Sequence, residues 1–257
     1  MRSPLLAYFG HHKCATRWVN GIIGRSCKRL GLRRVIFNGP RAFDGNLPKA
    51  IKASDADFLC YGNAGYHHVQ TLGSYRAFHM VRDPRDIAVS AYFSHKHSHK
   101  IREGGELTPD YRQRLQSLDK EAGLLRELER RASQFRQMAQ WNYEDPNILE
   151  VRFEDVTKDP NHWFRQILGF LGILADASEP GHAPTLAETE LAQILEKVSF
   201  ATKSGGRSVG DEDVHNHYRK GVSGDWANHF GPAHVEYFKA HYNDVLLKLG
   251  YETQPDW

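Results

Sequence analysis

Lys13 lies in a short polar segment between two apolar stretches, an arrangement in which proteins bind phosphate-like anions. Residues 5–9 form an apolar run typical of a buried strand, and apolar residues recur at helical spacing from residue 18, which predicts a helix beginning near Thr16. Backbone N–H groups and the dipole at a helix N-terminus favour an anion, and the Lys13 ammonium adds charge. The segment lacks the Gly-Lys-Ser/Thr ending of a Walker loop. On these residues alone, a polar turn between a core strand and a core helix is the simpler interpretation.

A second cation, Arg82, directly follows another predicted strand. Asp83 suits a helix N-cap, Pro84 the first helical position and Asp86 the first turn, so helix capping explains these three residues but not Arg82. Ser90 lies two turns into the predicted helix and offers a hydroxyl to the same anion. The alternative is a capped helix with solvated arginines.

Two adjacent cations, Arg219 and Lys220, precede Gly221, where the chain can approach a ligand closely. Viewed alone, this segment equally suits an exposed basic turn. Together with the loop at Lys13 and with Arg82, it suits a ligand that carries phosphate-type groups at two ends.

The elements that must position these residues follow from five short apolar stretches, at residues 5–9, 34–37, 57–61, 77–81 and 148–151. Because helical sequence separates them, they predict an α/β fold with a parallel sheet of about five strands, covered by helices on both faces. Ligands bind beyond the carboxyl ends of such strands, where Lys13 is expected. Further helices are expected at residues 16–30, 162–171, 186–198 and 232–249.

Residues 111–142 are rich in Arg, Glu, Gln and Leu and predict a helix pair or a lid within a helical acceptor region at residues 93–145. No internal repeat or linker is evident, so one domain over residues 1–257 is the economical interpretation.

The composition is that of an ordinary globular protein, with 257 residues and a formal net charge of +3. This charge is too small to favour nucleic acid or a membrane surface as a partner. Three cysteines cannot form a disulfide framework, and no apolar run reaches membrane-spanning length. A cytoplasmic enzyme or binding protein is therefore expected.

Taken together, the motifs resemble those of the cytosolic-type sulfotransferases, which use 3′-phosphoadenosine 5′-phosphosulfate (PAPS) as sulfuryl donor. Residues 12–18 resemble the family's 5′-phosphosulfate loop, and Arg82 and Ser90 have the spacing of its 3′-phosphate pair. Residues 219–230 are similar to its C-terminal signature nearly letter for letter. Residues 151–155 resemble its Arg-Tyr-Glu-Asp segment.

The resemblance implies a P-loop-like phosphosulfate loop and an in-line attack on sulfur by an acceptor hydroxyl or amine, without metal. Lys13 is the implied catalytic lysine, and the aromatic rings of Trp18 and Phe200 flank the adenine. The positions implied for donor binding are Lys13, Cys14, Ala15, Thr16, Arg17, Trp18, Arg82, Ser90, Phe153, Phe200, Arg219, Lys220 and Gly221.

The sequence also departs from the family pattern. Ala15 replaces the loop glycine, Arg17 replaces its second threonine and Phe153 replaces the usual tyrosine. The C-terminal dimer motif survives only at Glu236, with Ala227, Gly231 and Pro232 at its other key positions, so a dimer of the family's type is not expected. The family's catalytic histidine has no clear counterpart in residues 60–64.

Four histidines are therefore candidates for the general base: His11, His12, His67 and His68. We favour His12 because it adjoins Lys13. A histidine that merely packs the loop is the alternative.

The alternation of His95, His97 and His99 suggests a metal site only weakly, because such cationic stretches are more often mobile and solvated. An anionic acceptor such as a sulfated or uronic sugar would also suit this stretch. The expected acceptor is a small molecule or a carbohydrate, selected by residues 93–140 and 172–190.

Two other functions stay open. A kinase on the same kind of sheet is one of them, although the absence of the Walker ending and of a clear Mg²⁺-binding pattern weakens this interpretation. A nucleotide-binding protein without catalysis would explain the missing histidine.

Overall fold

The structure, a computed structural model, describes residues 4–101, 107–175 and 185–257. It divides into two compact units, each made of two separate stretches of the chain. The first comprises Met1–Arg82 and Gln140–Ser199, and the second comprises Asp83–Ala139 and Phe200–Trp257. The single domain expected over residues 1–257 stays a prediction. Residues 102–106 of the expected helical acceptor region at 93–145, and residues 176–184 of the stretch 172–190 expected to select the acceptor, lie outside the described residues.

The described part of the first unit contains a five-stranded sheet in which neighbouring strands are parallel, in the order β2-β3-β1-β4-β5. The strands are β1 (Leu5–Gly10), β2 (Arg34–Asn38), β3 (Phe58–Gly62), β4 (Tyr75–Val81) and β5 (Ile148–Arg152). In the central strand β1, Tyr8 pairs with Cys60 on one side and with Phe78 on the other. The strand order reverses beside β1, which is where ligands bind in open α/β sheets. The predicted α/β fold and all five predicted strands are confirmed.

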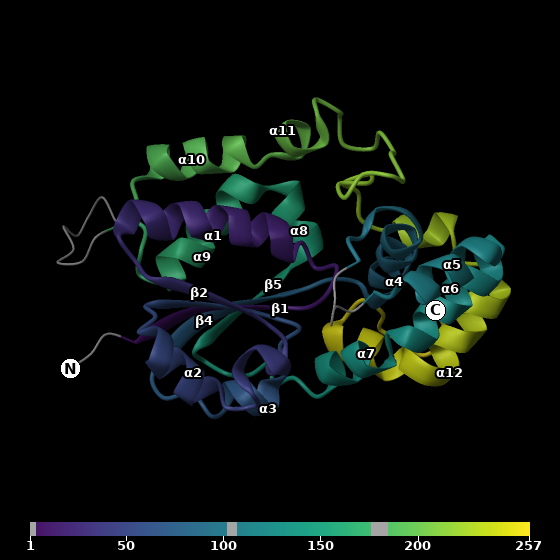
Figure 1. Ribbon diagram of the computed structural model, residues 1–257, viewed down its shortest axis with the longest axis horizontal. Helices are drawn as coiled ribbons and strands as arrows, with labels where there is room; N and C mark the ends of the chain where they lie inside the picture. The colour runs from purple at the N-terminus through teal and green to yellow at the C-terminus, as the bar shows by residue number, and fades with distance from the viewer. Residues whose placement is uncertain (1–3, 102–106, 176–184) are drawn as a thin grey trace. The chain divides into compact units, whose positions relative to one another are not determined.

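In the described residues of this unit, four helices lie on one side of the sheet, among them α1 (Figure 1). They are α1 (Thr16–Leu30), α8 (Phe153–Lys158), α9 (Pro160–Phe170) and α10 (Glu188–Lys197). Tyr8 and Met80 of the sheet share a buried apolar cluster with Val19 and Ile22 of α1. Because burying one Ile or Val side chain contributes about 1.5–3 kcal/mol, this packing holds α1, and with it the loop that precedes α1.

The other face is covered by η1 (Pro40–Phe43), α2 (Leu47–Ser54) and α3 (Tyr66–Val69) (Figure 1). Successive side chains of a strand point to opposite faces, so Ala7 and Phe9 pack on this side while Tyr8 packs on the other. Trp141 is fully buried in the same cluster. Most side chains on both faces of the sheet are therefore apolar, as the continuous apolar strands predict.

The second unit is helical in its described residues. Its helices are α4 (Pro84–Phe93), the π-helical turn η2 (Ser94–Ser98), α5 (Pro109–Ser117), α6 (Lys120–Arg130), α7 (Ala132–Ala139), α11 (Phe200–Ser204), η3 (Asp225–Asn228) and α12 (Pro232–Leu249). Val89 of α4 shares an apolar cluster with Leu115 of α5 and Leu124 of α6. Phe135 of α7 packs against Phe238 of α12, with ring centroids 5.8 Å apart.

The stretch predicted as a helix pair or a lid forms three helices, α5, α6 and α7. Asp119 separates the first two because its side chain accepts a hydrogen bond from the backbone N–H of Ala122 and so caps α6. Arg131 ends α6. Whether these helices act as a lid stays a prediction.

The expectation that the histidine-rich stretch is solvated is wrong for His95. This side chain is fully buried, and its Nδ1 lies 3.0 Å from Oε2 of the equally buried Glu127. Glu127 also accepts a hydrogen bond from the Tyr111 hydroxyl and pairs with Arg131. A buried carboxylate needs such partners, and His95 is one of them. His95 therefore has a structural role in the second unit.

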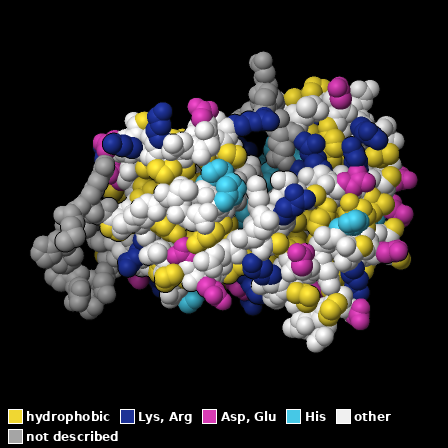
Figure 2. All heavy atoms as spheres, turned by 90° about the horizontal axis from the view of Figure 1, so that it is seen from below, with side chains coloured by type: hydrophobic (Ala, Val, Ile, Leu, Met, Phe, Trp, Pro, Cys, Tyr) yellow, Lys and Arg dark blue, Asp and Glu magenta, His cyan; other side chains and the backbone are white. Residues whose placement is uncertain are grey.

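On the face drawn in Figure 2, Lys and Arg side chains are interspersed with Asp and Glu. Among the described residues, no helix combines the length and the apolar character that crossing a bilayer requires.

Candidate active site

The loop between β1 and α1 turns sharply through two residues in the left-handed region, Lys13 with φ 65° and Ala15 with φ 54°. The carbonyl oxygen of His11 closes the turn by accepting hydrogen bonds from the backbone N–H of Cys14 (3.2 Å) and from the Thr16 hydroxyl (3.0 Å). Ala15 is the N-cap of α1 and provides no side-chain cap. Left-handed residues in such a turn direct backbone N–H groups into a concave surface that favours anions. The geometry of the loop therefore suits a phosphate-like group.

Replacing Ala15 with glycine should stabilise the protein. An L-residue in the left-handed region costs about 1–2 kcal/mol, whereas the extra freedom of glycine in the unfolded chain costs about 0.4–1 kcal/mol. We expect the free energy of unfolding in urea to rise by about 0.5–1 kcal/mol in Ala15→Gly. Ala50→Gly, inside the right-handed helix α2, is the control, and its free energy of unfolding should fall by about 0.5–1 kcal/mol. A loss of similar size at Ala15 would show that its backbone is not strained.

Arg82, which follows β4, reaches this loop. Its Nη1 donates a hydrogen bond to the carbonyl oxygen of Lys13 at 3.2 Å, and its guanidinium lies over the Phe153 ring, 4.3 Å from the centroid. The structure thus brings together three residues that the sequence predicted for one site, Lys13, Arg82 and Phe153. Phe153 supports Arg82 through its ring face, a contact that needs no hydroxyl.

Cys14 of the loop, and Arg17 and Trp18 in the first turn of α1, differ in their surroundings. Cys14 is fully buried, and burial raises the pKa of its thiol to about 12 although Arg82 lowers it. Its side chain is therefore not a nucleophile, and its predicted contribution is limited to the backbone. Trp18 is half-buried and packs edge-on against Phe164, with ring centroids 5.5 Å apart. Arg17 is exposed.

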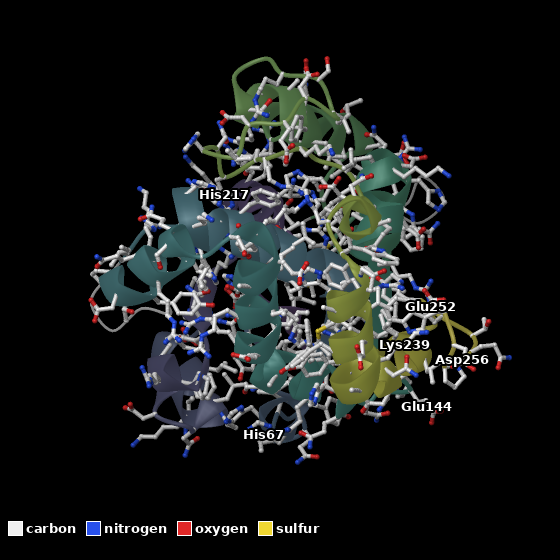
Figure 3. The ribbon with its side chains drawn as sticks, turned by 90° about the vertical axis from the view of Figure 1, so that its right-hand side faces the viewer. His67, Glu144, His217, Lys239, Glu252 and Asp256 are labelled. Atoms are coloured by element: carbon white, nitrogen blue, oxygen red, sulfur yellow. The ribbon has the colours of Figure 1, made fainter. Side chains whose placement is uncertain are left out.

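The four candidate histidines have different surroundings. His67 is exposed on α3 (Figure 3). The His68 Nδ1 lies 3.0 Å from the Tyr61 hydroxyl, and burial, followed by the neighbouring His67, lowers the pKa of His68. His12 is half-buried beside Lys13. His11 is fully buried, and burial lowers its pKa well below the ordinary value, with a further contribution from His79.

His11 belongs to a buried polar chain that the sequence did not reveal. Its Nε2 lies 2.9 Å from Nε2 of His79, whose Nδ1 lies 2.7 Å from Oε2 of Glu150. The indole N–H of Trp141 donates to the other oxygen of Glu150 at 2.9 Å, and the Trp141 ring stacks on His79. His79 and Glu150 pair across neighbouring strands β4 and β5. The signal available in the sequence was one histidine and one glutamate, each flanked by apolar residues within a predicted strand.

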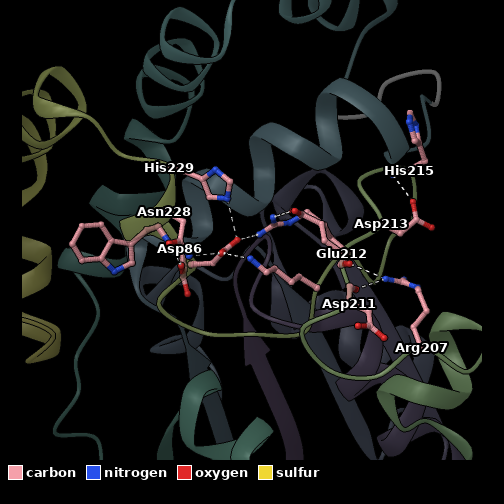
Figure 4. A network of polar contacts seen from close by, with 12 residues as sticks. Asp86, Arg207, Asp211, Glu212, Asp213, His215, Asn228 and His229 are labelled. Carbon is pink, nitrogen blue, oxygen red and sulfur yellow. Dashed lines mark hydrogen bonds and ion pairs between the residues drawn. The ribbon is translucent and has the colours of Figure 1, made fainter.

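In the second unit, the predicted pair Arg219 and Lys220 converges on Asp225 (Figure 4). Arg219 Nη2 lies 2.5 Å from one carboxylate oxygen, and Lys220 Nζ lies 2.7 Å from the other. Asn228 and His229 also contact this carboxylate, at 3.0 Å and 3.1 Å. Burial alone would raise the pKa of Asp225, but the hydrogen bonds from Lys220, Arg219 and Asn228 together hold it well below its usual range.

Asp86 connects this network to α4. Its carboxylate accepts hydrogen bonds from the backbone N–H groups of Gly224 (2.8 Å) and Trp226 (2.9 Å), the two neighbours of Asp225. Ser90 is one turn further along the same helix, and Phe93 follows it, with its ring 4.6 Å from the Arg219 guanidinium carbon. The sequence identified Asp86 only as a first-turn residue, because its partners are 138 and 140 residues away.

Phe200 and Gly221, both predicted donor-binding residues, are in contact. Gly221 has φ 73°, and a Cβ atom there would lie 2.8 Å from the Phe200 ring. Only glycine fits this backbone conformation and this close approach.

One group of possible metal ligands occurs in the second unit. Ligand atoms of Glu212, Asp225 and His229 lie within 4.8 Å of one another. Arg219 and Lys220 already bind the Asp225 carboxylate, and their positive charges oppose a metal cation at the same oxygens.

Comparisons with known proteins agree with the motifs. Residues 73–250 match the family model described as a sulfotransferase domain. Sulfotransferase 2A1 of Mus musculus is 30% identical over 171 residues, which cover 63% of this chain and 53% of the relative. Sulfotransferase 1C2 of Homo sapiens is 31% identical over 99 residues, which cover 38% of this chain and 33% of the relative. The chain thus spans at most about half the length of these two curated relatives.

Solved structures show the same fold. Mouse sulfotransferase SULT7A1, complexed with PAP, aligns with a TM-score of 0.62 and 19% identity, covering 96% of this chain and 84% of that one. Retinol dehydratase in complex with androsterone and inactive cofactor PAP aligns with a TM-score of 0.58 and 16% identity, covering 96% and 82%. Because the family model matches most of the sequence, this chain belongs to the sulfotransferase family.

Proposed function

We propose that this chain transfers a sulfuryl group from PAPS to a hydroxyl or amine of a small-molecule or carbohydrate acceptor. The observation that carries the proposal is the loop between β1 and α1, where the turn at Lys13 and Ala15 presents backbone N–H groups and Arg82 contacts the Lys13 carbonyl. This loop lies outside the residues that the family model matches, so it supports the function independently. Two relatives of the same fold hold PAP, the product left when PAPS gives up its sulfuryl group.

In the proposed reaction, the acceptor oxygen or nitrogen attacks sulfur in line as the bond from sulfur to the bridging phosphate oxygen breaks. PAP leaves with the electron pair of that bond, and a general base takes the acceptor's proton. Lys13 would neutralise the charge that grows on the bridging oxygen, and the backbone N–H groups of Ala15 and Thr16 would hold the 5′-phosphate, because the N–H of Cys14 already donates to the His11 carbonyl. Arg17 is proposed to contact the same phosphate group.

The other donor contacts rest on the motif match. Trp18 and Phe200 are proposed to flank the adenine. Three cations and one hydroxyl are proposed to hold the 3′-phosphate: Arg82, Arg219, Lys220 and Ser90. Phe153 would support Arg82 through its ring, and Gly221 would let the chain approach the phosphate closely. No metal has a role in this proposal.

The protein should bind adenosine 3′,5′-bisphosphate, which is PAP, far more tightly than AMP. The physical reason is that Arg82 and its partners would meet a phosphate that AMP lacks, and one hydrogen bond to a charged group is worth about 1.5–3 kcal/mol. Arg82→Ala should therefore lower the affinity for PAP by about tenfold or more and leave the affinity for AMP nearly unchanged, as measured by calorimetry. Arg152→Ala is the control, because Arg152 is an exposed arginine at the end of the neighbouring strand. Equal affinities of the wild-type protein for PAP and AMP would contradict the clamp.

We propose His12 as the base, because it adjoins Lys13 in the loop and is half-buried. The buried chain gives a specific reason to keep His11 as a second candidate. When His79 is neutral and donates from Nδ1 to Glu150, its Nε2 accepts a hydrogen bond from the Nε2–H of His11, and Nδ1 of His11 is left with a lone pair. That Nδ1 is buried without a hydrogen-bond partner among the described residues.

A proton taken up at Nδ1 of His11 would be balanced by transfer of the Nε2 proton to His79. His79 would then be an imidazolium paired with the Glu150 carboxylate. His11 would stay neutral throughout, as its burial requires. The two candidates are distinguished by substitution, as described in the Discussion.

Incubation with PAPS and a panel of alcohols, phenols, amines and sugars tests the function. We expect one PAP released for each sulfated product. PAP binding without transfer to any acceptor would favour the nucleotide-binding alternative, and turnover of Mg²⁺-ATP would favour the kinase. A cytoplasmic location is part of the proposal, because the three cysteines are free and buried.

A further inference from the structure

Two consecutive cationic side chains do not ordinarily converge. Neighbouring side chains point to opposite sides of an extended chain and diverge around a helix. Arg219 and Lys220 lie outside helices and strands, yet their cationic groups end on the two oxygens of one carboxylate, that of Asp225. Asp225 is 2% exposed, so this carboxylate is fixed inside the second unit rather than being a mobile surface group.

The position of Asp225 is itself determined by α4. Asp86, in the first turn of that helix, accepts hydrogen bonds from the backbone N–H groups on both sides of Asp225, at Gly224 and Trp226. Asp86 is 1% exposed. Ser90 lies one turn beyond Asp86 on the same helix. One helix therefore carries the predicted 3′-phosphate hydroxyl and, through Asp86 and Asp225, also holds the two cations.

The backbone of the pair is held separately. Arg207 donates hydrogen bonds to the carbonyl oxygens of Tyr218 (2.5 Å) and Arg219 (2.9 Å), and the N–H of Gly210 donates to the carbonyl oxygen of Lys220 (2.9 Å). Figure 4 labels Arg207 and, in the segment that follows it, Asp211, Glu212 and Asp213. Backbone contacts fix where the two residues lie, but only a shared partner fixes where both cationic groups point.

We propose that Asp225 is a positioning residue, which holds Arg219 and Lys220 in the arrangement that receives the 3′-phosphate of the donor. The proposal rests on the proposed function and assigns a role to a residue that would not contact the donor itself. The guanidinium has five N–H donors and the ammonium has three, so hydrogen bonds to Asp225 leave donors for a phosphate. Because Asp225 orders the two long side chains before the phosphate arrives, they lose less conformational entropy on binding.

A different role for Asp225 would change the affinity for PAP in the opposite direction when its charge is removed. If Asp225 merely neutralised the two cations, it would compete with the phosphate, and removing its charge would increase the affinity for PAP. If Asp225 preorganises the cations, removing its charge should decrease the affinity. The direction of the change therefore separates the two roles.

The test is calorimetry of PAP and AMP binding to Asp225→Asn, with thermal unfolding measured in parallel. We expect PAP binding to weaken by about 10–100-fold, by analogy with the loss of metal affinity when an outer partner that orients a metal ligand is removed. AMP binding should change less than about twofold, because AMP has no 3′-phosphate. Glu212→Gln is the matched control, since Glu212 also pairs with Arg219 but not with Lys220 and is exposed, and it should leave PAP binding within about twofold.

Three results would overturn the proposal: tighter PAP binding by Asp225→Asn, equal weakening of PAP and AMP, or an equal loss in Glu212→Gln. If Asp225→Asn does not fold, Asn228→Ala provides the same test, because Asn228 donates to Oδ1 of Asp225 at 3.0 Å. The affinity of this variant for PAP should fall by about threefold, and its affinity for AMP should not change. If the affinity for PAP does not fall selectively, the role proposed for Asp225 is wrong. A wild-type protein that binds PAP no better than AMP would instead refute the proposed function.

Discussion

Replacing Lys13 with alanine should abolish turnover while PAP binding falls only modestly. Charge on the bridging oxygen grows in the transition state, so a preorganised cation there acts mainly on the rate. Removing one such donor costs about 2.7–4 kcal/mol, which corresponds to about 10²–10³ in kcat. The measurement is the initial rate of PAP release from PAPS at saturating acceptor, with PAP affinity measured by calorimetry.

Lys28→Ala is the control for this variant, because Lys28 is an exposed lysine near the C-terminal end of α1, the helix that the Lys13 loop precedes. It should retain the wild-type rate. If Lys13→Ala keeps more than about a tenth of the wild-type rate, less than about 1.4 kcal/mol is at stake and Lys13 is not the catalytic lysine.

His12→Asn should lower the rate by about 10²–10⁴, the usual contribution of a general base, with PAP binding intact. The acidic limb of the pH–rate profile should disappear with it, because protonation of the base would no longer limit the reaction. His67→Asn is the control, since His67 is exposed on α3 and should affect acceptor binding at most.

The same experiment distinguishes the two candidate bases. If His12→Asn remains active while His11→Asn and His79→Phe lose activity without losing PAP binding, the proton passes along the buried chain to Glu150. If His67→Asn or His68→Asn loses activity instead, the base lies beyond β3 and both assignments are wrong.

The sequence predicted the sheet because each strand is a nearly continuous apolar run, and parallel strands covered on both faces require such runs. It also predicted α1 from residue 16 to residue 30 and the neighbourhood of Lys13 and Arg82, because the carboxyl ends of adjacent parallel strands meet at one edge. The loop conformation was less predictable. The left-handed backbone at position 15 was not predictable because the residue there is alanine, whereas a glycine would have indicated it.

Buried polar contacts between distant residues were not predictable from local patterns. Asp86 was assigned to helix capping, but its partners lie at Gly224 and Trp226. His95 was expected in solvent because charged and polar neighbours surround it in sequence, whereas Glu127, 32 residues away, pairs with it in the interior. Such pairings depend on which helices pack together, and the periodicity of one segment carries no information about its neighbour.

The most direct measurement is a crystal structure of the protein with adenosine 3′,5′-bisphosphate. The account predicts the 5′-phosphate against the backbone N–H groups of residues 15 and 16 with Lys13 beside it, and the 3′-phosphate in contact with Arg219 and Lys220. Asp225 should keep its hydrogen bonds to both cations in that complex. A nucleotide bound elsewhere, or a 3′-phosphate that touches neither cation, would contradict the account.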